Sequence, residues 1–459
     1  MNPGDVPLDL LGRYNVPGPR YTSYPTAPVW KEGWGSSDYE AILRRSSGSR
    51  DPAPLSLYVH LPFCERLCYF CGCTVVITRN HVVEEAYLAA LEREIGWVAG
   101  FAGEGRTVVQ FHLGGGTPTY FEPARLRRLS EAVRRRFPFA EDAEVGVEID
   151  PRVTTAQHLE TLAELGFNRL SMGVQDFDPR VQRAINRIQP YEATRELVET
   201  ARGLGFPSVN LDLIFGLPFQ TADTFAATID KVLSIGPDRL AVYSYANVPW
   251  LKKHQRVLEP HLPDEATKFQ IFRTALERFT SAGFEYIGMD HFARPDDELA
   301  RARRDRTLHR NFQGYTTKAG TDLLGLGMSA IGSIGDAYVQ NRRELPEYHR
   351  AVEAGGAATF RGVRLSPDDL LRRRAIGNLL CHGVLIKSEL EAEFGVVFDE
   401  EFSEALDRLA PMERDGLVEI GPREIRATPL GRVFLRNLAM CFDAYLAESP
   451  EKPVFSRTL

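Results

Sequence analysis

Four of the six cysteines in this 459-residue chain lie within ten residues, in the segment "HLPFCERLCYFCGC". They are Cys64, Cys68, Cys71 and Cys73, and their spacing is C-x3-C-x2-C-x-C. Thiols this close in sequence cannot join distant segments as a disulfide framework does, so the spacing indicates a metal centre. A structural zinc site usually divides its ligands between two separated pairs, and ferredoxins space their cysteines differently, so both alternatives fit poorly.

The segment just before this loop and the segments after it alternate between apolar strands and amphipathic helices. Strands are expected at 55–61, 107–113, 144–149, 169–174, 208–215 and 239–245, with helical segments between them. Repeated β–α units predict an α/β fold with a parallel sheet and outer helices. The number of units suits either a doubly wound sheet or an incomplete barrel.

Several polar or small residues fall at or near the carboxyl ends of these strands, where barrel active sites assemble. They are Cys64, Gly115, Glu148, Gln175, Asp212 and Ala246. Asp212 is the clearest case, because it lies in an otherwise apolar strand and an unpaired buried carboxylate is costly. The alternative for Asp212 is a structural aspartate paired with backbone amides.

Four regions are expected along the chain. Residues 1–50 are rich in Pro, Gly, Tyr and Ser and predict an extended arm, and residues 51–295 hold the β–α units. Residues 296–360 predict a substrate or cofactor loop and linker. Residues 361–459 predict a mostly helical domain whose element order resembles a winged helix, with a packing role because its third helix carries more acid than base.

The bulk properties exclude several classes of protein. A net charge of −7 argues against a general nucleic-acid binder. No apolar run approaches the ~18 residues of a membrane span, and the first residues lack the pattern of a signal peptide. We therefore expect a cytoplasmic protein with reduced thiols. We also expect a monomer, because no long apolar seam is visible.

The C-x3-C-x2-C part of the loop resembles the signature of the radical S-adenosylmethionine enzymes. This resemblance implies that Cys64, Cys68 and Cys71 hold a 4Fe–4S cluster whose fourth iron binds S-adenosylmethionine, the source of a 5′-deoxyadenosyl radical. Cys73 exceeds the required number of ligands. It is either a small thiol packed beside the cluster or a ligand when the cofactor is absent.

Further motifs extend the resemblance over nearly the whole chain, including "PRYTSYPTA", "HLGGGTPTY", "RLSMGVQDF", "NLDLIFGLP" and "HRNFQGYTTKAGTDLLGLGMSAIG". Together they resemble the oxygen-independent coproporphyrinogen III oxidase family. This family implies an incomplete (β/α)6 TIM-like barrel that binds two S-adenosylmethionine molecules. It also implies oxidative decarboxylation of two propionates of coproporphyrinogen III, giving protoporphyrinogen IX, with an electron donor and an electron acceptor that the sequence does not identify.

The same resemblance assigns residues to the cofactors. Tyr58, Glu148 and Ile331 should contact the cluster-bound S-adenosylmethionine. The second molecule should contact Gln175, Arg187, Asp212 and Ala246. The full cofactor-binding set is Tyr58, Phe70, Gly114, Gly115, Gly116, Thr117, Glu148, Gln175, Arg187, Asp212, Ala246 and Ile331.

A substrate with four carboxylates needs basic groups, and arginine suits carboxylates because its planar fork binds both oxygens. The candidate substrate residues are Arg20, Tyr21, Arg304, His309 and Arg310, with Arg303 and Tyr24 as neighbours. The alternative for "RARRDR" (301–306) is a solvated helix face. We expect the arm to fold over the substrate pocket.

Three other functions stay open. They are a haem-utilisation radical enzyme, such as a porphyrin-modifying methyltransferase, a haem-binding chaperone, and a zinc-stabilised scaffold. The first two are paralogues that generally lack the "RYTSYPT" arm and the CxC that ends at Cys73, and this chain has both features.

Overall fold

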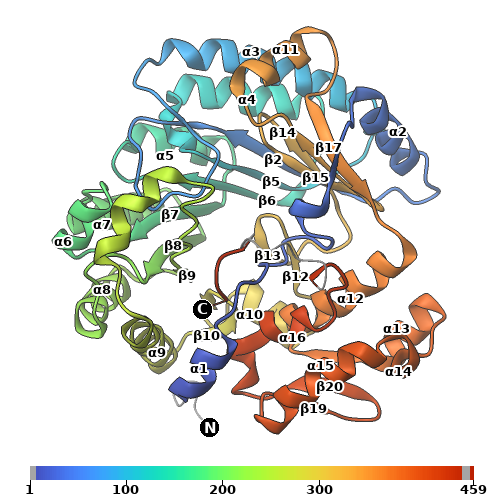
Figure 1. Ribbon diagram of the computed structural model, residues 1–459. Coiled ribbons are helices and arrows are strands. Elements are labelled where there is room, and N and C mark those ends of the chain that lie inside the picture. The colour runs from blue at the N-terminus through green and yellow to red at the C-terminus, as the bar shows by residue number, and fades with distance from the viewer. Residues whose placement is uncertain (1–6, 447–454, 459) are drawn as a thin grey trace.

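The computed structural model describes residues 7–446 and 455–458. Among these residues, one sheet of thirteen strands runs through the molecule (Figure 1). Its centre is formed by six neighbouring parallel strands, which are β2 (Leu55–Leu61), β5 (Val108–Gly115), β6 (Phe139–Ile149), β7 (Arg169–Gln175), β8 (Ser208–Phe215) and β9 (Arg239–Ser244). These are the six strands expected from the sequence, so that prediction and the α/β class are confirmed.

Helices follow the central strands and cover the outer side of the curved sheet (Figure 1). They are α3 (Val82–Ala99), α4 (Pro123–Arg134), α5 (Ala156–Glu164), α6 (Pro179–Ala184), α7 (Tyr191–Gly203), α8 (Ala222–Ile235) and α9 (Glu265–Ser281). Their boundaries follow local chemistry: the Thr221 hydroxyl caps the start of α8, and Gly236, at φ 74°, ends it. Apolar side chains between sheet and helices form one large buried core.

The sheet continues beyond the six central strands on both sides. β14 (Asp322–Leu326) pairs in parallel with β2, and next come β15 (Ile331–Ile334), β16 (Ala337–Asn341), β17 (Thr359–Arg364) and β1 (Lys31–Glu32). At the other edge β9 pairs with β11 (His291–Ala293), which pairs with β10 (Glu285–Gly288).

Residues 296–360, expected as a loop and linker, therefore supply strands to the main sheet. They also contain α10 (Glu298–Arg304), the hairpin β12 (His309–Asn311) and β13 (Gly314–Thr316), and α11 (Leu345–Glu353). These strands could not be recognised from the sequence, because they are short or rich in glycine and gain regular structure by pairing with the parallel core.

The N-terminal arm is only partly extended. It contains α1 (Leu8–Tyr14), the short 3-10 helix η2 (Ala27–Val29) and α2 (Ser36–Ser47), and the stretch between α1 and η2 crosses the molecule without regular structure. The Tyr21 hydroxyl donates to Asp443 at 2.8 Å, and the Tyr24 hydroxyl accepts from the backbone of Ala444 at 3.0 Å. The arm thus bridges the sheet and the C-terminal part of the chain.

The C-terminal part is mostly helical, with one small sheet in the order β18-β20-β19. Its elements are α12 (Pro367–His382), β18 (Val384–Ile386), α13 (Lys387–Phe394), α14 (Phe398–Glu401), α15 (Ser403–Arg414), β19 (Val418–Ile420), β20 (Glu424–Ala427), η5 (Gly431–Phe434) and α16 (Leu435–Met440). In Figure 1 these elements lie at the lower right, beside the open side of the sheet.

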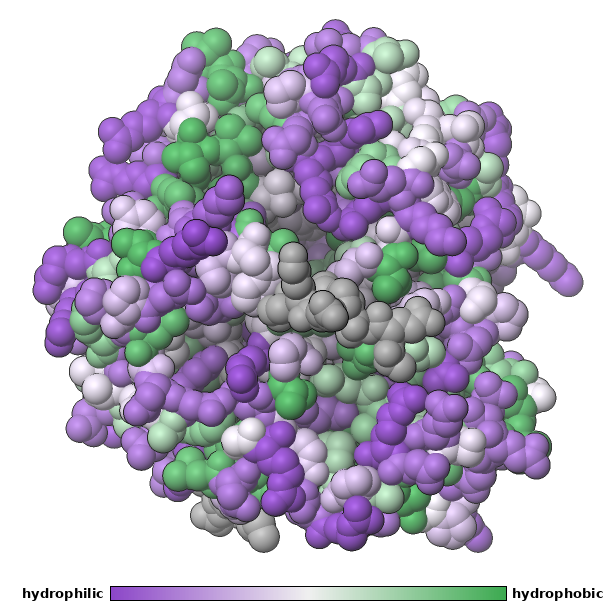
Figure 2. All heavy atoms as spheres, in the orientation of Figure 1, coloured by the Kyte–Doolittle hydropathy of each residue, from purple (hydrophilic) through white to green (hydrophobic). Residues whose placement is uncertain are grey.

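The visible surface is mixed in character. Figure 2 shows hydrophilic side chains over much of this face, with hydrophobic ones in separate groups. Within the described residues, no helix combines the length and the apolar character that crossing a membrane requires.

Candidate active site

The cysteine loop begins where β2 ends, at the carboxyl edge of the central strands. Cys64 ends the two-residue strand β3 (Phe63–Cys64), which pairs with β4 (Val76–Ile77). Cys68 is buried, Cys64 and Cys71 are half-buried, and Cys73 is exposed. None of the six cysteines forms a disulfide.

Side chains from a distant 3-10 helix, η4 (Lys253–His261), and the residue before it hold the backbone of this loop. Lys252 Nζ donates to the Cys73 carbonyl at 2.6 Å, His254 Nε2 lies 2.9 Å from the Cys71 carbonyl oxygen, and Gln255 Nε2 donates to the Phe70 carbonyl at 2.9 Å. The sequence reasoning missed these three residues. Their signal was a run of polar donors, "KKHQ", shortly after the sixth strand.

The environment of the thiols suits metal ligation in part. A hydrogen bond with Cys73 lowers the pKa of Cys71 against the opposing effect of burial, and Lys252 and His254 lower it further, which favours the thiolate that metal ligation needs. Burial raises the pKa of Cys64 to about 12, so a bound cation must displace that proton.

The placement of the thiols bears on the kind of metal centre that the loop could hold. Among the described residues, no three His, Cys, Asp or Glu side chains converge as a mononuclear site requires. A cubane cluster asks each thiolate to reach a different iron, so three separate thiols on one short loop fit it. The residues therefore suit a 4Fe–4S cluster better than zinc.

A buried network of charges lies against Cys68. Asp150, one residue after β6, accepts from Arg187 Nη1 at 2.9 Å and from Arg152 Nη2 at 2.7 Å. The Nη2 group of Arg152 also lies 3.3 Å from the Cys68 sulfur, and Nη1 of Arg187 lies 3.7 Å from it. Burial opposes ionisation of Asp150, but the two arginines outweigh it and hold the pKa of Asp150 well below its usual range. This network places positive charge beside the Cys68 sulfur, which favours the anionic form that a metal ligand needs.

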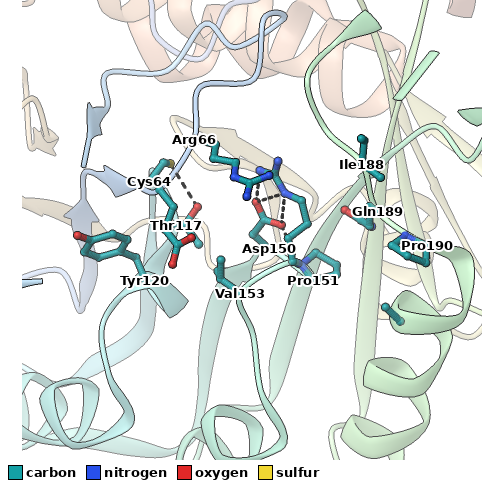
Figure 3. Close-up of a pocket in the computed structure, with 13 residues that line it drawn as sticks. Cys64, Arg66, Thr117, Tyr120, Asp150, Pro151, Val153, Ile188, Gln189 and Pro190 are labelled. Carbon is teal, nitrogen blue, oxygen red and sulfur yellow. Dashed lines mark hydrogen bonds and ion pairs between the residues drawn. The ribbon is translucent and has the colours of Figure 1, made fainter. Parts of the chain in front are cut away.

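The cavity beside this network has a volume of about 340 Å³ and reaches Cys64, Thr117, Asp150 and Arg152. Figure 3 shows Cys64 facing Thr117, whose hydroxyl lies 3.3 Å from the thiol sulfur, with Asp150 just beyond the end of β6. Arg187 was expected in the site, whereas Asp150 and Arg152 were not. A carboxylate directly after a strand end, two residues from Glu148, was the signal that could have found them.

The glycines after β5 let the backbone approach the cysteine loop. At Gly115, φ is 116° and a Cβ would lie 2.7 Å from the His60 ring. At Gly116 a Cβ would lie 2.6 Å from the backbone of Pro62. Neither position accepts a side chain without moving its neighbour. Thr117 closes the run by donating its backbone N–H to Phe63 at 3.0 Å.

Tyr58 and Glu148 lie beside two histidines. The Tyr58 hydroxyl lies 3.1 Å from His60 Nδ1, and its ring stacks on His112. Glu148 accepts from the Gly115 N–H at 3.2 Å and lies 3.5 Å from His112 Nε2. Burial raises the pKa of Glu148, but these partners lower it more, so the carboxylate is ionised with its side chain 47% exposed.

The remaining expected cofactor residues lie on neighbouring strands. Gln175 ends β7 with a left-handed φ of 69°, and Arg187 also donates to the Gly173 carbonyl at 2.6 Å. Asp212 on β8 accepts from Asn210 at 2.7 Å, and burial followed by the Glu148 charge raises its pKa to about 7. Ala246 follows β9 and accepts from Gln255 at 3.2 Å.

Ile331 and Phe70 lie at opposite sides of this group. Ile331 begins β15, and its carbonyl oxygen occupies the space that a Cβ on Gly325 would need, while Gly325 pairs with Tyr58. Phe70 packs against a separate apolar cluster that includes Leu217 and Tyr245. The expected cofactor residues therefore surround the carboxyl edge of β14, β2 and β5–β9.

The expected substrate residues separate into two groups. Arg20 pairs with Asp290 and lies over the Tyr243 ring at 5.6 Å, near the end of β9. Arg310 lies over Tyr315 at 4.8 Å, and its Nε and Nη1 have no hydrogen-bond partner among the described residues. These two arginines face the interior of the molecule.

Arg304 is placed differently. Its guanidinium pairs with Glu285 and donates to the Pro295 carbonyl at 2.8 Å, and Arg303 pairs with the same glutamate at 2.9 Å. Arg304 is exposed, which fits the alternative of a solvated helix face for "RARRDR". Tyr21 and His309 both line a second cavity, although the Tyr21 hydroxyl is already bonded to Asp443.

Comparison with known proteins places the chain in a family. The Radical SAM superfamily matches residues 58–232, and the HemN C-terminal domain matches residues 365–434. The oxygen-independent coproporphyrinogen III oxidases of Salmonella typhimurium strain LT2 and Escherichia coli strain K12 are 48% and 47% identical, each over 99% of both chains. The Pseudomonas aeruginosa protein of the same name is 45% identical over 98% of both chains.

A solved structure gives the same result. It is described as coproporphyrinogen III oxidase (HemN) from Escherichia coli, a radical SAM enzyme, and it superposes with a TM-score of 0.91 at 46% identity, covering 96% of this chain and 99% of that one. The fold, the cysteine loop and this full-length similarity agree, and the chain belongs to the oxygen-independent coproporphyrinogen III oxidase family of radical S-adenosylmethionine enzymes.

Proposed function

We propose that the protein converts two propionate side chains of coproporphyrinogen III to vinyl groups without oxygen, giving protoporphyrinogen IX. The observation that carries this proposal is the three-cysteine loop at the carboxyl edge of the central strands, in a chain 47% identical over its length to a named relative. For each vinyl group, one hydrogen atom leaves the β-carbon, carbon dioxide leaves, and one electron passes to an acceptor not yet identified.

Cys64, Cys68 and Cys71 would hold the cluster, and Tyr58, Glu148 and the Gly114–Thr117 run would bind the S-adenosylmethionine attached to it. When bound, the cluster and S-adenosylmethionine supply the electron and the adenosyl radical that removes the hydrogen atom. Two properties of these side chains support the assignment. Burial raises the pKa of Tyr58 well above its usual range, so its hydroxyl stays protonated and can donate a hydrogen bond. The half-exposed Glu148 carboxylate can accept hydrogen bonds from hydroxyl groups.

A second S-adenosylmethionine would lie against Gln175, Arg187, Asp212 and Ala246. Gln175, Asp212 and Ala246 belong to three consecutive strands or follow them, and Arg187, which comes after α6, is held against β7 by its bond to the Gly173 carbonyl. With its pKa near 7, Asp212 is about half protonated at neutral pH and can donate as well as accept. Arg187 keeps a buried Nε without a partner among the described residues.

Arg20 and Arg310 would position the substrate by pairing with its carboxylates. The position of Arg20 near the end of β9 supports this role, and Arg310 lies over Tyr315, which is linked to Tyr243 of β9 through His291. Charge-assisted pairs of this kind are short and directional, so they orient a ligand as well as bind it.

The finer architecture also belongs to this proposal. The six consecutive parallel β–α units and the curvature in Figure 1 support an incomplete TIM-like barrel. The order α12-β18-α13-α14-α15-β19-β20 supports a winged-helix-like domain, and a packing role for it rests on the acidic character of its third helix. A monomeric state, a separate electron donor and the boundaries at residues 50, 295 and 360 stay predictions.

Turnover under anaerobic conditions tests the function. The protein is reconstituted with iron and sulfide and incubated with S-adenosylmethionine, a reductant, coproporphyrinogen III and a cell extract that supplies the acceptor. We expect protoporphyrin after oxidation together with 5′-deoxyadenosine, and loss of both in Cys68→Ser.

Other outcomes would contradict the proposal in different ways. Formation of 5′-deoxyadenosine without a vinyl product would indicate a haem-utilisation enzyme. Tight haem binding with neither product would indicate a chaperone. A colourless protein that takes up one equivalent of zinc would indicate a scaffold.

A further inference from the structure

A second cavity, of about 480 Å³, shares no lining residue with the cavity beside the cysteine loop. It lies between three segments that are distant in sequence. They are Tyr21–Tyr24 of the arm, the first strand of the β12–β13 hairpin, and helix α12. In Figure 1 these segments meet at the open side of the sheet, between the sheet and the C-terminal elements.

Its wall contains polar atoms that lack partners. Arg310 Nε and Nη1, Asn378 Nδ2 and His382 Nδ1 are buried and have no hydrogen-bond partner among the described residues. Asn378 is only 5% exposed. A buried donor without an acceptor costs about 1–3 kcal/mol, so these groups indicate that a ligand supplies acceptor oxygens.

The lining side chains that form no ion pair carry a net positive charge. Its two lining carboxylates are already paired, Asp322 with Arg106 at 2.6 Å and Glu393 with Arg374 at 3.2 Å. Arg310 and Arg373 line the same cavity and form no ion pair among the described residues. The nearest polar contact of Arg373 is the Tyr338 hydroxyl at 3.5 Å.

The histidines of the cavity do not add to this charge at neutral pH. Burial, together with Arg306 and Arg374, lowers the pKa of His382 to about 4. Burial and two arginines of α12 also lower the pKa of His309. The cavity therefore presents two uncompensated guanidiniums and neutral hydrogen-bonding groups.

The rest of the wall is apolar and aromatic. Phe312, Tyr338, Leu370 and Ile376 line it beside the polar groups, and Phe312 packs edge-on against Tyr338. This combination suits a ligand with an apolar body and carboxylate arms. The unpartnered Nε and Nη1 of Arg310 lie on different edges of the guanidinium, so each can donate to a separate acceptor oxygen of a ligand.

Arg310 also connects this cavity to the end of β9. Its guanidinium covers the Tyr315 ring, Tyr315 contacts His291 with ring centroids 5.2 Å apart, and His291 contacts Tyr243 at 5.9 Å. A ligand held at Arg310 therefore lies next to the interior face where Tyr243 and Arg20 meet.

We propose that this cavity is a carboxylate-binding subsite, in which Arg310, Arg373 and Asn378 hold propionates that are not being oxidised. The inference rests on the proposed function. The described residues contain one cysteine loop for two successive decarboxylations, so the tetrapyrrole must turn between them. A fixed subsite gives the remaining carboxylates a partner in both orientations and retains the intermediate, which has one vinyl group and three carboxylates.

Binding to the protein without its cluster tests the subsite apart from turnover. The probe is coproporphyrin III, the stable oxidised form that keeps four propionates, and its fluorescence is titrated with protein. We expect Arg373→Gln and Asn378→Leu each to raise Kd at least tenfold. The matched control is Arg364→Gln, an exposed arginine outside the cavity, which should leave Kd within twofold of the unsubstituted protein.

Protoporphyrin IX, which keeps only two propionates, provides a second comparison. If the subsite holds the two propionates that never react, Arg373→Gln raises Kd for both porphyrins by similar factors. In turnover, the same substitution should increase the released fraction of the tricarboxylate intermediate several-fold, whereas Arg364→Gln should not.

Coproporphyrin III binding within twofold of the unsubstituted protein in both Arg373→Gln and Asn378→Leu would overturn the subsite, even if vinyl product forms normally. Circular dichroism and the tryptophan emission of Arg373→Gln establish that this variant is folded. Failure of the proposed function looks different, because the porphyrin binds and responds to these substitutions but no vinyl product forms.

Discussion

Replacing Asp150 with asparagine removes the carboxylate that pairs with two arginines beside Cys68 and keeps its volume. The side chains of Asp150 and Arg187 are only 9% and 7% exposed, and that of Arg152 is 18% exposed. Removing one partner of a buried ion pair costs about 3–5 kcal/mol because the other charge stays buried. The amide oxygen of asparagine still accepts one hydrogen bond, so we expect the lower end, about 3 kcal/mol.

The assay is urea denaturation of the protein without its cluster, followed by circular dichroism, for Asp150→Asn and for Asp142→Asn as control. Asp142 is 86% exposed and lies 3.8 Å from Lys318, so its substitution should change the free energy of unfolding by about 0.5 kcal/mol or less. The pKa of Asp150 is lowered in the folded state, so its stabilisation is present above the unfolded pKa and is lost as pH falls through the folded pKa. The difference between Asp150→Asn and the unsubstituted protein should therefore be constant from pH 5 to 8.

A loss below about 1 kcal/mol at pH 7 would refute the reasoning, because it would mean that water or backbone groups already compensate the two arginines. The cluster gives an independent signal. Without Asp150, uncompensated positive charge lies against Cys68, so the reduction potential of the reconstituted cluster should rise, as measured by a titration monitored by electron paramagnetic resonance.

Three further substitutions have defined outcomes. The pKa of Asp212 is raised to about 7 in the folded state, so its contribution to stability is complete below its unfolded pKa and is lost as pH rises towards 7, by up to about 4 kcal/mol. Asp212→Asn should lack this decline in urea titrations between pH 4 and 8. Gly116→Ala should destabilise the protein by about 2 kcal/mol or more, because the added Cβ meets the Pro62 backbone. Gly203→Ala is the control, since Gly203 has open space around it in α7, and it should be neutral or slightly stabilising. Equal thermal midpoints for the two variants would contradict this expectation. Arg310→Gln should lower kcat/KM at least tenfold while Arg304→Gln leaves it unchanged, and an equal loss in both would mean that charge near α10, and not the interior guanidinium, matters.

The central strands could be predicted because each is a local apolar run between turn signals, and no tertiary contact is needed to recognise such a run. β14–β17 could not be predicted in the same way. Their residues are short or rich in glycine, and they become strands because β14 pairs with β2, more than 250 positions earlier in the chain. The arm was expected to be extended, but apolar residues such as Leu11 and Ile42 make α1 and α2 pack into the core.

The candidate site shows the same division. The proposed cluster ligands could be named from the sequence, because the C-x3-C-x2-C spacing resembles the signature of the radical S-adenosylmethionine enzymes. Asp150, Arg152, Lys252, His254 and Gln255 were missed, because each acts through a contact with a residue far away in sequence. Arg304 has the residue type that a substrate site needs, yet its partner Glu285 holds it on an exposed helix.

The sequence by itself therefore determined the cysteine loop, the six β–α units and the polar groups at their strand ends, because spacing and periodicity are local properties. Only the tertiary structure decided which charges are compensated. Arg310, Arg373 and Asn378 come from a hairpin and a helix that meet at one cavity, and their missing partners become visible only when burial is known. The physical reason is that the energy of a charge or donor depends on its solvent exposure and on its neighbours, which a residue's position in the chain does not give.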